Sequence, residues 1–222
     1  MTGPLFSDRA AAGRMLADRL RGGPWHDPLV LAIPRGGIEV AAPVAEGLAA
    51  ELDVVLSRKL RAPYQSELAI GAIAEDGAVH LNAFAAAMAE ADEAWIEAEK
   101  ERQLAEIARR REMIRRVRPA ARPAGRSVIV VDDGIATGAT MIAALHTVPA
   151  ERPRELVVAV PVAPPDRVAA IRPLCDRLVC LHERDDFQAV GQCYDSFPQV
   201  EDDRVLDLLR AAARPLAAAS VP

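Results

Sequence analysis

The segment at residues 128–140, Val-Ile-Val-Val-Asp-Asp-Gly-Ile-Ala-Thr-Gly-Ala-Thr, constrains the fold more than any other part of the chain. Its first four residues are β-branched and apolar, which is typical of a strand buried on both faces of a parallel sheet. Asp132 and Asp133 follow at the carboxyl end, where open α/β sheets bind their ligands. The apolar residues 141–145 then indicate a helix. The segment therefore predicts a strand, a turn and a helix of an α/β fold.

The turn between this strand and this helix has the composition of a phosphate-binding loop. Gly134 and Gly138 allow a tight backbone whose N–H groups point at an anion. Thr137 and Thr140 add hydroxyl donors, and the helix N-terminus adds partial positive charge. Because carboxylates accept hydrogen bonds from hydroxyls, the whole segment fits a phosphorylated ribose. A strand, an Asx-type turn and a helix cap without a ligand remain the alternative.

Residues 130–140 closely resemble the PRPP-binding motif of type I phosphoribosyltransferases, where PRPP is 5-phosphoribosyl 1-pyrophosphate. The resemblance implies that Asp132 and Asp133 bind the ribose 2′- and 3′-hydroxyls. It implies that the turn holds the 5′-phosphate through Ala136, Thr137, Gly138, Ala139 and Thr140. It also implies Mg2+ as the cofactor, coordinated mainly by substrate oxygens, with Asp132 and Asp133 as ligands directly or through water.

The rest of the chain predicts the same fold class. Apolar runs that fit strands recur at residues 29–33, 54–56, 128–131, 156–160 and 178–181. Helices are predicted at residues 9–21, 38–50, 141–145, 202–209 and after Pro164, and a β-hairpin at residues 69–74 and 79–81. We therefore predict a single α/β domain over residues 1–222, a Rossmann-like parallel sheet flanked by helices. It carries a helical insertion at residues 83–118 and a C-terminal hood segment and helix at residues 182–222.

A second strand, turn and helix precede the motif. Arg35, Gly36 and Gly37 follow the predicted strand at residues 29–33, and βαβ topology places this turn beside the motif turn. The family resemblance implies that the basic, glycine-containing turn contacts pyrophosphate. A Gly-Gly helix entry is otherwise an ordinary turn.

Two adjacent cations, Arg58 and Lys59, follow the next predicted strand. The same Arg-Lys pair occurs in orotate phosphoribosyltransferases, where the lysine engages pyrophosphate and the next loop is a mobile lid. We therefore predict Arg58 and Lys59 as catalytic residues beside the two motif aspartates, and residues 60–68 as a loop that closes over the ligand. Arg61 is a further candidate, for which a solvated strand end is an equal alternative.

Residues 83–118 contain neither Gly nor Pro, with acids in the first half and arginines in the second, which predicts a long helix or a helical pair. Its regular apolar stripe, Leu104, Ile107 and Ile114, is narrow. We expect it to pack on a neighbouring helix or on a second subunit, as in a homodimer. Because nothing in it resembles a base or nucleophile site, we predict a role in assembly or acceptor coverage without a catalytic group.

Three aromatic residues, Phe187, Tyr194 and Phe197, lie in the predicted hood. Aromatic rings beside the strand ends could stack on a flat base, and in the resembling family a hood from both chain ends covers the acceptor. Ordinary packing beneath a surface loop is the alternative.

Composition excludes several classes of protein. The net charge of −5 and the pI near 5.5 argue against nucleic-acid binding through a global basic field. No apolar run reaches the roughly 18 residues of a membrane span, and residues 1–8 lack the features of a secretory signal, so we expect a cytoplasmic protein. Cys175, Cys180 and Cys193 lack zinc-site spacing and are predicted to be reduced thiols.

The resemblance implies an enzyme of nucleotide metabolism. It would transfer the phosphoribosyl group of PRPP to a nitrogen nucleophile and release pyrophosphate. The 6-oxopurine enzymes of the family carry an acid at the position of Ala136, so hypoxanthine and guanine are disfavoured acceptors. A non-catalytic PRPP-sensing regulator and a nucleotide-binding protein are the alternatives.

Overall fold

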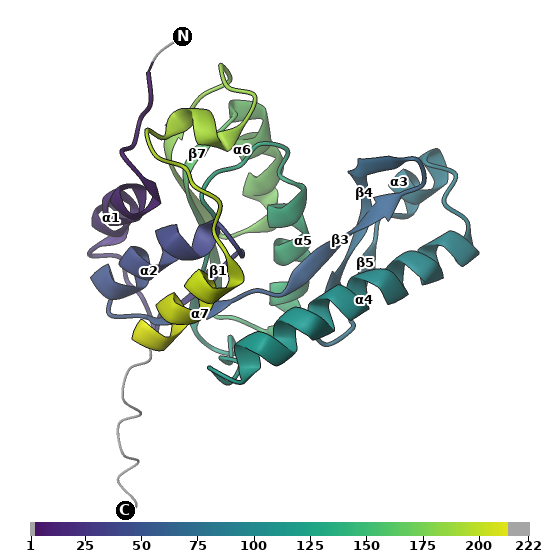
Figure 1. The fold of residues 1–222 in the computed structure, drawn as a ribbon, viewed down its shortest axis with the longest axis horizontal. Coiled ribbons are helices and arrows are strands. Elements are labelled where there is room, and N and C mark those ends of the chain that lie inside the picture. The colour runs from purple at the N-terminus through teal and green to yellow at the C-terminus, as the bar shows by residue number, and fades with distance from the viewer. Residues whose placement is uncertain (1–2, 213–222) are drawn as a thin grey trace, which may run out of the picture.

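A five-stranded parallel sheet in the order β2-β1-β6-β7-β8 forms the centre of the computed structural model, which describes residues 3–212 apart from the side chains of Ser66 and Glu67 (Figure 1). The strands are β1 (Leu29–Ala32), β2 (Glu51–Val54), β6 (Ser127–Val131), β7 (Glu155–Ala163) and β8 (Arg177–Glu183). This confirms the predicted α/β fold with a parallel sheet. The strand predicted at residues 54–56 lies earlier, because the structure buries the carboxylate of Asp53 inside β2.

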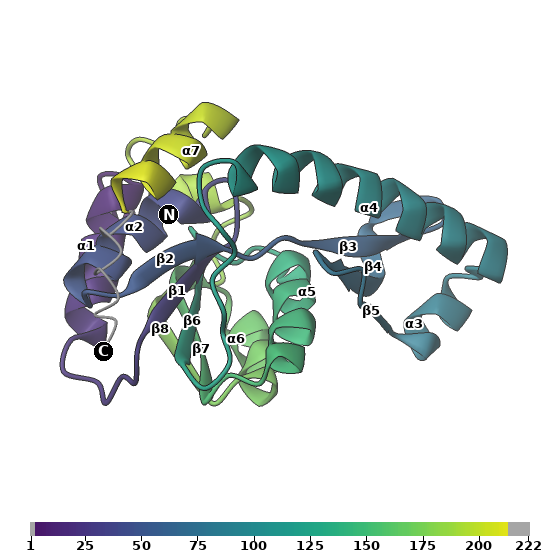
Figure 2. The same cartoon turned by 90° about the horizontal axis from the view of Figure 1, so that it is seen from below.

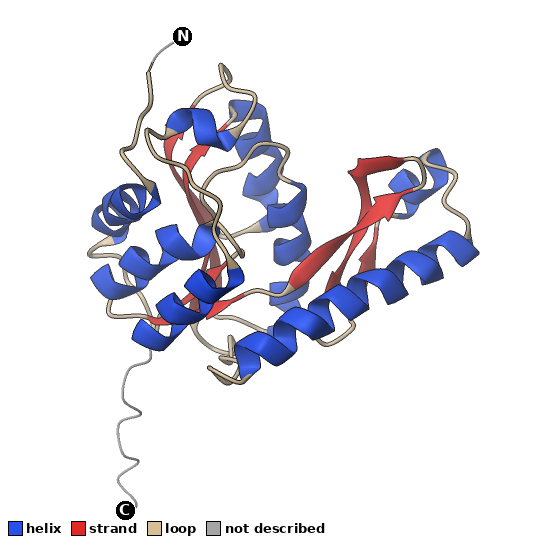
Figure 3. Cartoon of the chain, viewed as in Figure 1, coloured by secondary structure: helices blue, strands red, loops and turns tan. Residues whose placement is uncertain are grey.

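Helices cover both faces of this sheet (Figures 2 and 3). They are α1 (Arg9–Leu20), α2 (Gly37–Gly47) and α7 (Asp202–Ala211) on one face, and α5 (Ala139–Thr147) and α6 (Pro165–Ile171) on the other. Because successive strand residues point to opposite faces, Ile129 and Val131 pack with the first group, while Val128 and Val130 pack with the second. All residues of β6 are buried, as its β-branched run predicts.

A second sheet projects from the first as an arm (Figure 1). It is antiparallel, in the order β3-β4-β5, and consists of β3 (Ser57–Ala62), β4 (Gln65–Ala74) and β5 (Val79–Leu81). The predicted hairpin is confirmed by the pairing of β4 with β5. The loop predicted at residues 60–68 is wrong, because these residues form the end of β3, a turn and the start of β4. The charges of Arg58, Lys59 and Arg61 conceal the strand pattern, in which Leu60 and Ala62 are buried.

The predicted helical insertion is a pair, α3 (Ala83–Met88) and α4 (Glu93–Arg115), with α4 lying along the arm sheet (Figure 2). Ile107 and Ile114 are buried and Leu104 is partly buried in a cluster that includes Leu60 and Ile73 of the arm strands. The expected partner, a neighbouring helix or a second subunit, is therefore wrong: the stripe packs on a sheet of its own chain. Within residues 3–212, no helix has both the length and the apolarity needed to cross a bilayer.

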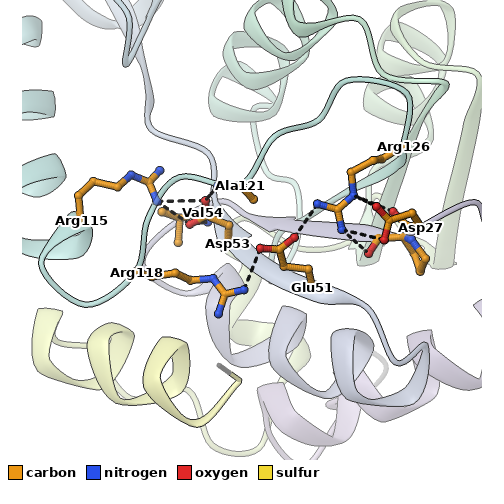
Figure 4. A network of polar contacts seen from close by, with 9 residues as sticks. Asp27, Glu51, Asp53, Val54, Arg115, Arg118, Ala121 and Arg126 are labelled. Carbon is orange, nitrogen blue, oxygen red and sulfur yellow. Dashed lines mark hydrogen bonds and ion pairs between the residues drawn. The ribbon is translucent and has the colours of Figure 1, made fainter. Parts of the chain in front are cut away.

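A buried polar network joins the arm to the main sheet (Figure 4). Asp53 of β2, 2% exposed, accepts hydrogen bonds from Arg115 at 2.8 and 3.0 Å and from the backbone N–H of Ala121 at 2.8 Å. Arg115 also donates to Glu75, at the end of the hairpin, at 2.9 and 3.1 Å. One guanidinium therefore connects α4, β2 and the arm hairpin.

Replacing Arg115 with Met should lower the free energy of unfolding by about 3 kcal/mol, because it leaves the buried carboxylate of Asp53 without its cation. Urea denaturation would measure the change. The matched control is Arg116→Gln, which breaks an exposed pair with Glu112 and should cost less than about 0.5 kcal/mol. Equal effects of the two substitutions would contradict a structural role of the network.

Candidate active site

The site lies between β1 and β6, the point in the sheet from which successive strands are added in opposite directions. The connection after β1 leads to β2 on one side, and the connection after β6 leads to β7 on the other. Such a switch point leaves a crevice at the carboxyl ends of the strands. Asp132 and Asp133 follow β6 into this crevice, and the N–H of Ile33, after β1, donates to the carbonyl of Val131 at 2.9 Å.

The predicted turn after β1 lies directly against the two aspartates. A Cβ on Gly36 would lie 1.9 Å from Oδ2 of Asp133, and one on Gly37 would lie 3.0 Å from Oδ1 of Asp132. The peptide bond between Pro34 and Arg35 is cis. Only glycine lets the backbone at positions 36 and 37 lie this close to the aspartate side chains. The Arg-Gly-Gly turn and the acidic pair therefore form one surface.

The motif turn leads into α5 as predicted. Gly138 has φ of +80° and precedes the helix, which begins at Ala139. Ala136, Thr137 and Thr140 are exposed. Gly138 provides no capping side chain, and the N–H of Ala139 makes only a long hydrogen bond, 3.5 Å, to Oγ1 of Thr137. The N–H groups at the start of α5 can therefore bind an anion placed in the turn.

Arg9 of α1 is a site residue that the sequence analysis missed. Its Nε donates to Oδ2 of Asp133 at 2.7 Å, and Nη1 donates to the carbonyl of Pro198 at 2.7 Å. The guanidinium lies 3.5 Å from the ring centroid of Phe197, and the residue is 5% exposed. A signal was present: a cation at the first position of a helix opposes the helix dipole, so another interaction must compensate it.

The acidic pair is electrostatically strained. Burial, together with the charge of Asp133, raises the pKa of Asp132 well above its usual value. Burial also raises the pKa of Asp133, an effect that the ion pair with Arg9 opposes. The hydroxyl of Tyr194 donates to the carbonyl of Asp133 at 2.6 Å, and burial raises the pKa of this phenol, so it remains a donor. The pair is therefore suited to hydroxyl groups or to a cation.

Segments from both ends of the chain meet beside Asp133. The N–H groups of Leu5 and Phe6 donate to the carbonyl of Cys193, at 2.8 and 3.1 Å, and Phe6 forms a parallel bridge with Tyr194. Tyr194 is buried and packs against Phe6, so it is part of the hood's core and not an exposed stacking surface.

Two cavities lie at the turns of the site, and Asp133 lines the first of them. The first, about 560 Å3, is lined by Arg9, Arg35, Gly36, Asp133, Val190, Phe197, Pro198, Gln199 and Val200. The second, about 100 Å3, lies between the arm and the two turns, and is lined by Ile33, Pro34, Val55, Leu56, Ser57, Arg58, Lys59, Arg61, Gln103, Ile107, Arg110 and Thr140. The structure thus brings the predicted cations of β3 to Thr140 of the motif turn. Of the three hood aromatics, Phe197 lines the first cavity.

A larger cavity, about 810 Å3, lies between α1, α2 and α7, and no residue of the motif turn lines it.

Replacing Asp132 with Asn should raise the melting temperature at pH 7. A carboxyl whose pKa is raised on folding destabilises the fold when ionised, and this cost disappears as the pH falls toward its ordinary value of 3.8. Relief of about 1 kcal/mol corresponds to about 2–4 °C for a chain of this size. Calorimetric melting of both proteins between pH 4 and 7 should show a gain that shrinks at low pH. A lower melting temperature of the variant at pH 7 would show that the ionised carboxylate of Asp132 does not destabilise the fold.

Comparison with known proteins identifies the family. The family model for the phosphoribosyl transferase domain matches residues 7–197. A Mycobacterium tuberculosis H37Rv protein named “Putative phosphoribosyl transferase Rv0571c” is 45% identical over 215 residues, which are 97% of this chain and 48% of that protein. The chain spans about half the length of the curated relatives it matches.

Solved structures share the fold of this chain. The protein TT1426 from Thermus thermophilus is 45% identical, with a TM-score of 0.86 over 94% of this chain and 99% of that chain. A hypothetical protein from Neisseria gonorrhoeae with bound ppGpp is 16% identical, with a TM-score of 0.50 over 96% of this chain and 99% of that one, and shares the fold alone. The protein therefore belongs to the phosphoribosyl transferase domain family.

Proposed function

We propose that the protein transfers the 5-phosphoribosyl group of PRPP to a nitrogen nucleophile and releases pyrophosphate. The observation that carries this proposal is the arrangement at the switch point. An acidic pair suited to hydroxyls, an anion-binding helix entry and a cavity lined by cations gather at the carboxyl ends of β1 and β6, and PRPP carries hydroxyls and two anionic groups that these features could bind. Membership of the family supports the same assignment.

PRPP would extend across both turns. The ribose hydroxyls would bind Asp132 and Asp133, and the 5′-phosphate would bind residues 136–140. The pyrophosphate would lie toward Arg35, Gly36 and Gly37 and the cationic cavity, which contains Arg58 and Lys59. Cations there offset the negative charge that builds up on pyrophosphate as it leaves.

The acidic pair also fits Mg2+. Its oxygen atoms are the ligands this ion prefers, and the raised pKa values show that the protein alone leaves the two charges poorly compensated. Asp133 already binds Arg9, so Asp132 is the carboxylate with more capacity for a cation or a coordinated water. When bound, the ion supplies charge neutralisation for the departing pyrophosphate.

The acceptor would enter the cavity lined by Asp133 and the hood, and the turn at Arg35 and Gly36 would lie between the acceptor and the pyrophosphate. Its nitrogen lone pair forms the new C–N bond at the anomeric carbon. The C–O bond to pyrophosphate breaks, its electron pair leaves with pyrophosphate, and the acceptor nitrogen loses its proton to water. The protein orients the two reactants and stabilises the charges. Phe197 and Val190 give this cavity apolar surface that suits a nucleobase. The family resemblance, through the alanine at position 136, disfavours hypoxanthine and guanine.

Replacing both Asp132 and Asp133 with Asn should weaken PRPP binding by about tenfold or more, because two charge-assisted hydrogen-bond acceptors are lost. Calorimetric titration with PRPP and Mg2+ measures this in a variant whose fold is checked by circular dichroism. Unchanged affinity would refute the ribose assignment.

A magnesium-dependent PRPP-consumption assay of the wild-type protein, over a panel of bases and amines, tests turnover. PRPP binding without pyrophosphate release would favour a PRPP-sensing regulator.

Lys59→Ala should lower kcat by about tenfold or more while changing KM less, because its contact strengthens as pyrophosphate gains charge. Lys100→Ala is the matched control, since the sequence contains only these two lysines and Lys100 pairs with Glu97 on the exposed face of α4. Steady-state kinetics of both variants separates the two constants. A loss confined to KM would contradict a role in the transition state.

A further inference from the structure

The cavity between the arm and the motif turn contains an unusual concentration of positive charge. Arg58, Lys59 and Arg61 of β3 line it from one side, and Arg110 of α4 lines it from another. Within the part of the chain that the structure describes, no aspartate or glutamate lines this cavity. Like charges gathered at a partly desolvated site repel each other, so an anion in the cavity would be stabilised.

Two arginines that line this cavity have a buried donor without an acceptor. Among residues 3–212, no group accepts a hydrogen bond from Nε of Arg110 or of Arg61. Nε of Arg118 and Nε of Arg177, which lie outside the cavity, are in the same state. Burial and the charge of Arg110 lower the pKa of the Arg58 guanidinium, against the opposing effect of Glu106. A buried donor without an acceptor is costly, and a ligand oxygen would remove this cost.

The rest of α4 holds the arm strand in position for this cavity. Glu99, 3% exposed, accepts from Nε2 of Gln103 at 2.8 Å and from the backbone N–H of Arg61 at 3.2 Å. Oε1 of Gln103 then accepts from Nε of Arg58 at 3.1 Å. On the other side, Nε1 of Trp95 donates to the carbonyl of Arg61 at 3.0 Å. The insertion therefore orients Arg58 and Arg61 through buried hydrogen bonds.

We propose that Arg110 of α4 binds the pyrophosphate of the substrate directly, and that Gln103, held by Glu99, is a positioning residue for Arg58. The inference rests on the proposed phosphoribosyl transfer. Pro34 and Thr140 line the same cavity, so its anion lies next to the two turns assigned to PRPP. The helical insertion then forms one wall of the active site, in place of the role in assembly or acceptor coverage that the sequence suggested.

The test compares Arg110→Gln with wild type by calorimetric titration, using three probes in the presence of Mg2+: pyrophosphate, inorganic phosphate and ribose 5-phosphate. Loss of one charged hydrogen-bond donor should weaken pyrophosphate binding by about tenfold. Ribose 5-phosphate, which lacks the pyrophosphate group, should bind within about twofold of wild type. The matched control is Arg116→Gln on the same helix, whose side chain is 74% exposed; it should bind both ligands as wild type does.

Each outcome decides the proposal. Selective loss of pyrophosphate binding, with partial recovery in Arg110→Lys, supports it. Unchanged pyrophosphate binding in Arg110→Gln overturns it, as does an equal loss of ribose 5-phosphate binding, which would indicate a structural defect. Wild-type protein that binds phosphate but not pyrophosphate also overturns it. The proposed function is judged separately, because it is decided by whether wild type consumes PRPP and releases pyrophosphate.

Discussion

The ion pair between Arg9 and Asp133 is the interaction on which the arrangement of the site depends. Two carboxylates on consecutive residues at the end of a buried strand repel each other and lose solvation. Arg9 compensates one of them, and the same guanidinium binds the carbonyl of Pro198 and the ring of Phe197. The first helix, the motif and the C-terminal segment are thus joined at one cation. The other carboxylate keeps its unfavourable charge, which ligands can relieve.

The arm depends on a different set of charges. Arg115 binds Asp53 inside the main sheet (Figure 4). It also binds Glu75 at the hairpin, so the arm is attached through a buried network as well as through apolar packing. At the other side of the arm, Glu99 and Gln103 orient the strand toward the cationic cavity. The long helix α4 contributes to both, which explains why its apolar stripe is so narrow: much of its inward face is polar and hydrogen-bonded.

The parts that sequence reasoning predicted are those with local signals. The β-branched run of β6 and the glycines of both turns each determine structure within a few residues. The errors arise where distant contacts decide. From the sequence alone, Asp53 indicates a break in a strand, but in the structure Arg115 compensates its charge. The cations of β3 likewise indicate a loop, but in the structure β4 pairs with this strand and Gln103 of α4 binds Arg58. Arg9 lies 124 residues from Asp133, so no local pattern connects the two.

The walls of the two cavities come from different stretches of the chain. The first takes much of its surface from the hood residues Val190 to Val200, whereas the second is built from the arm, the motif turn and the turn after β1. Among the residues that the structure describes, none lines both cavities. Substitutions in the hood would therefore reshape the first cavity and leave the walls of the second unchanged. Under the proposed function, related proteins could change their acceptor through the hood alone while keeping the cations that would bind pyrophosphate.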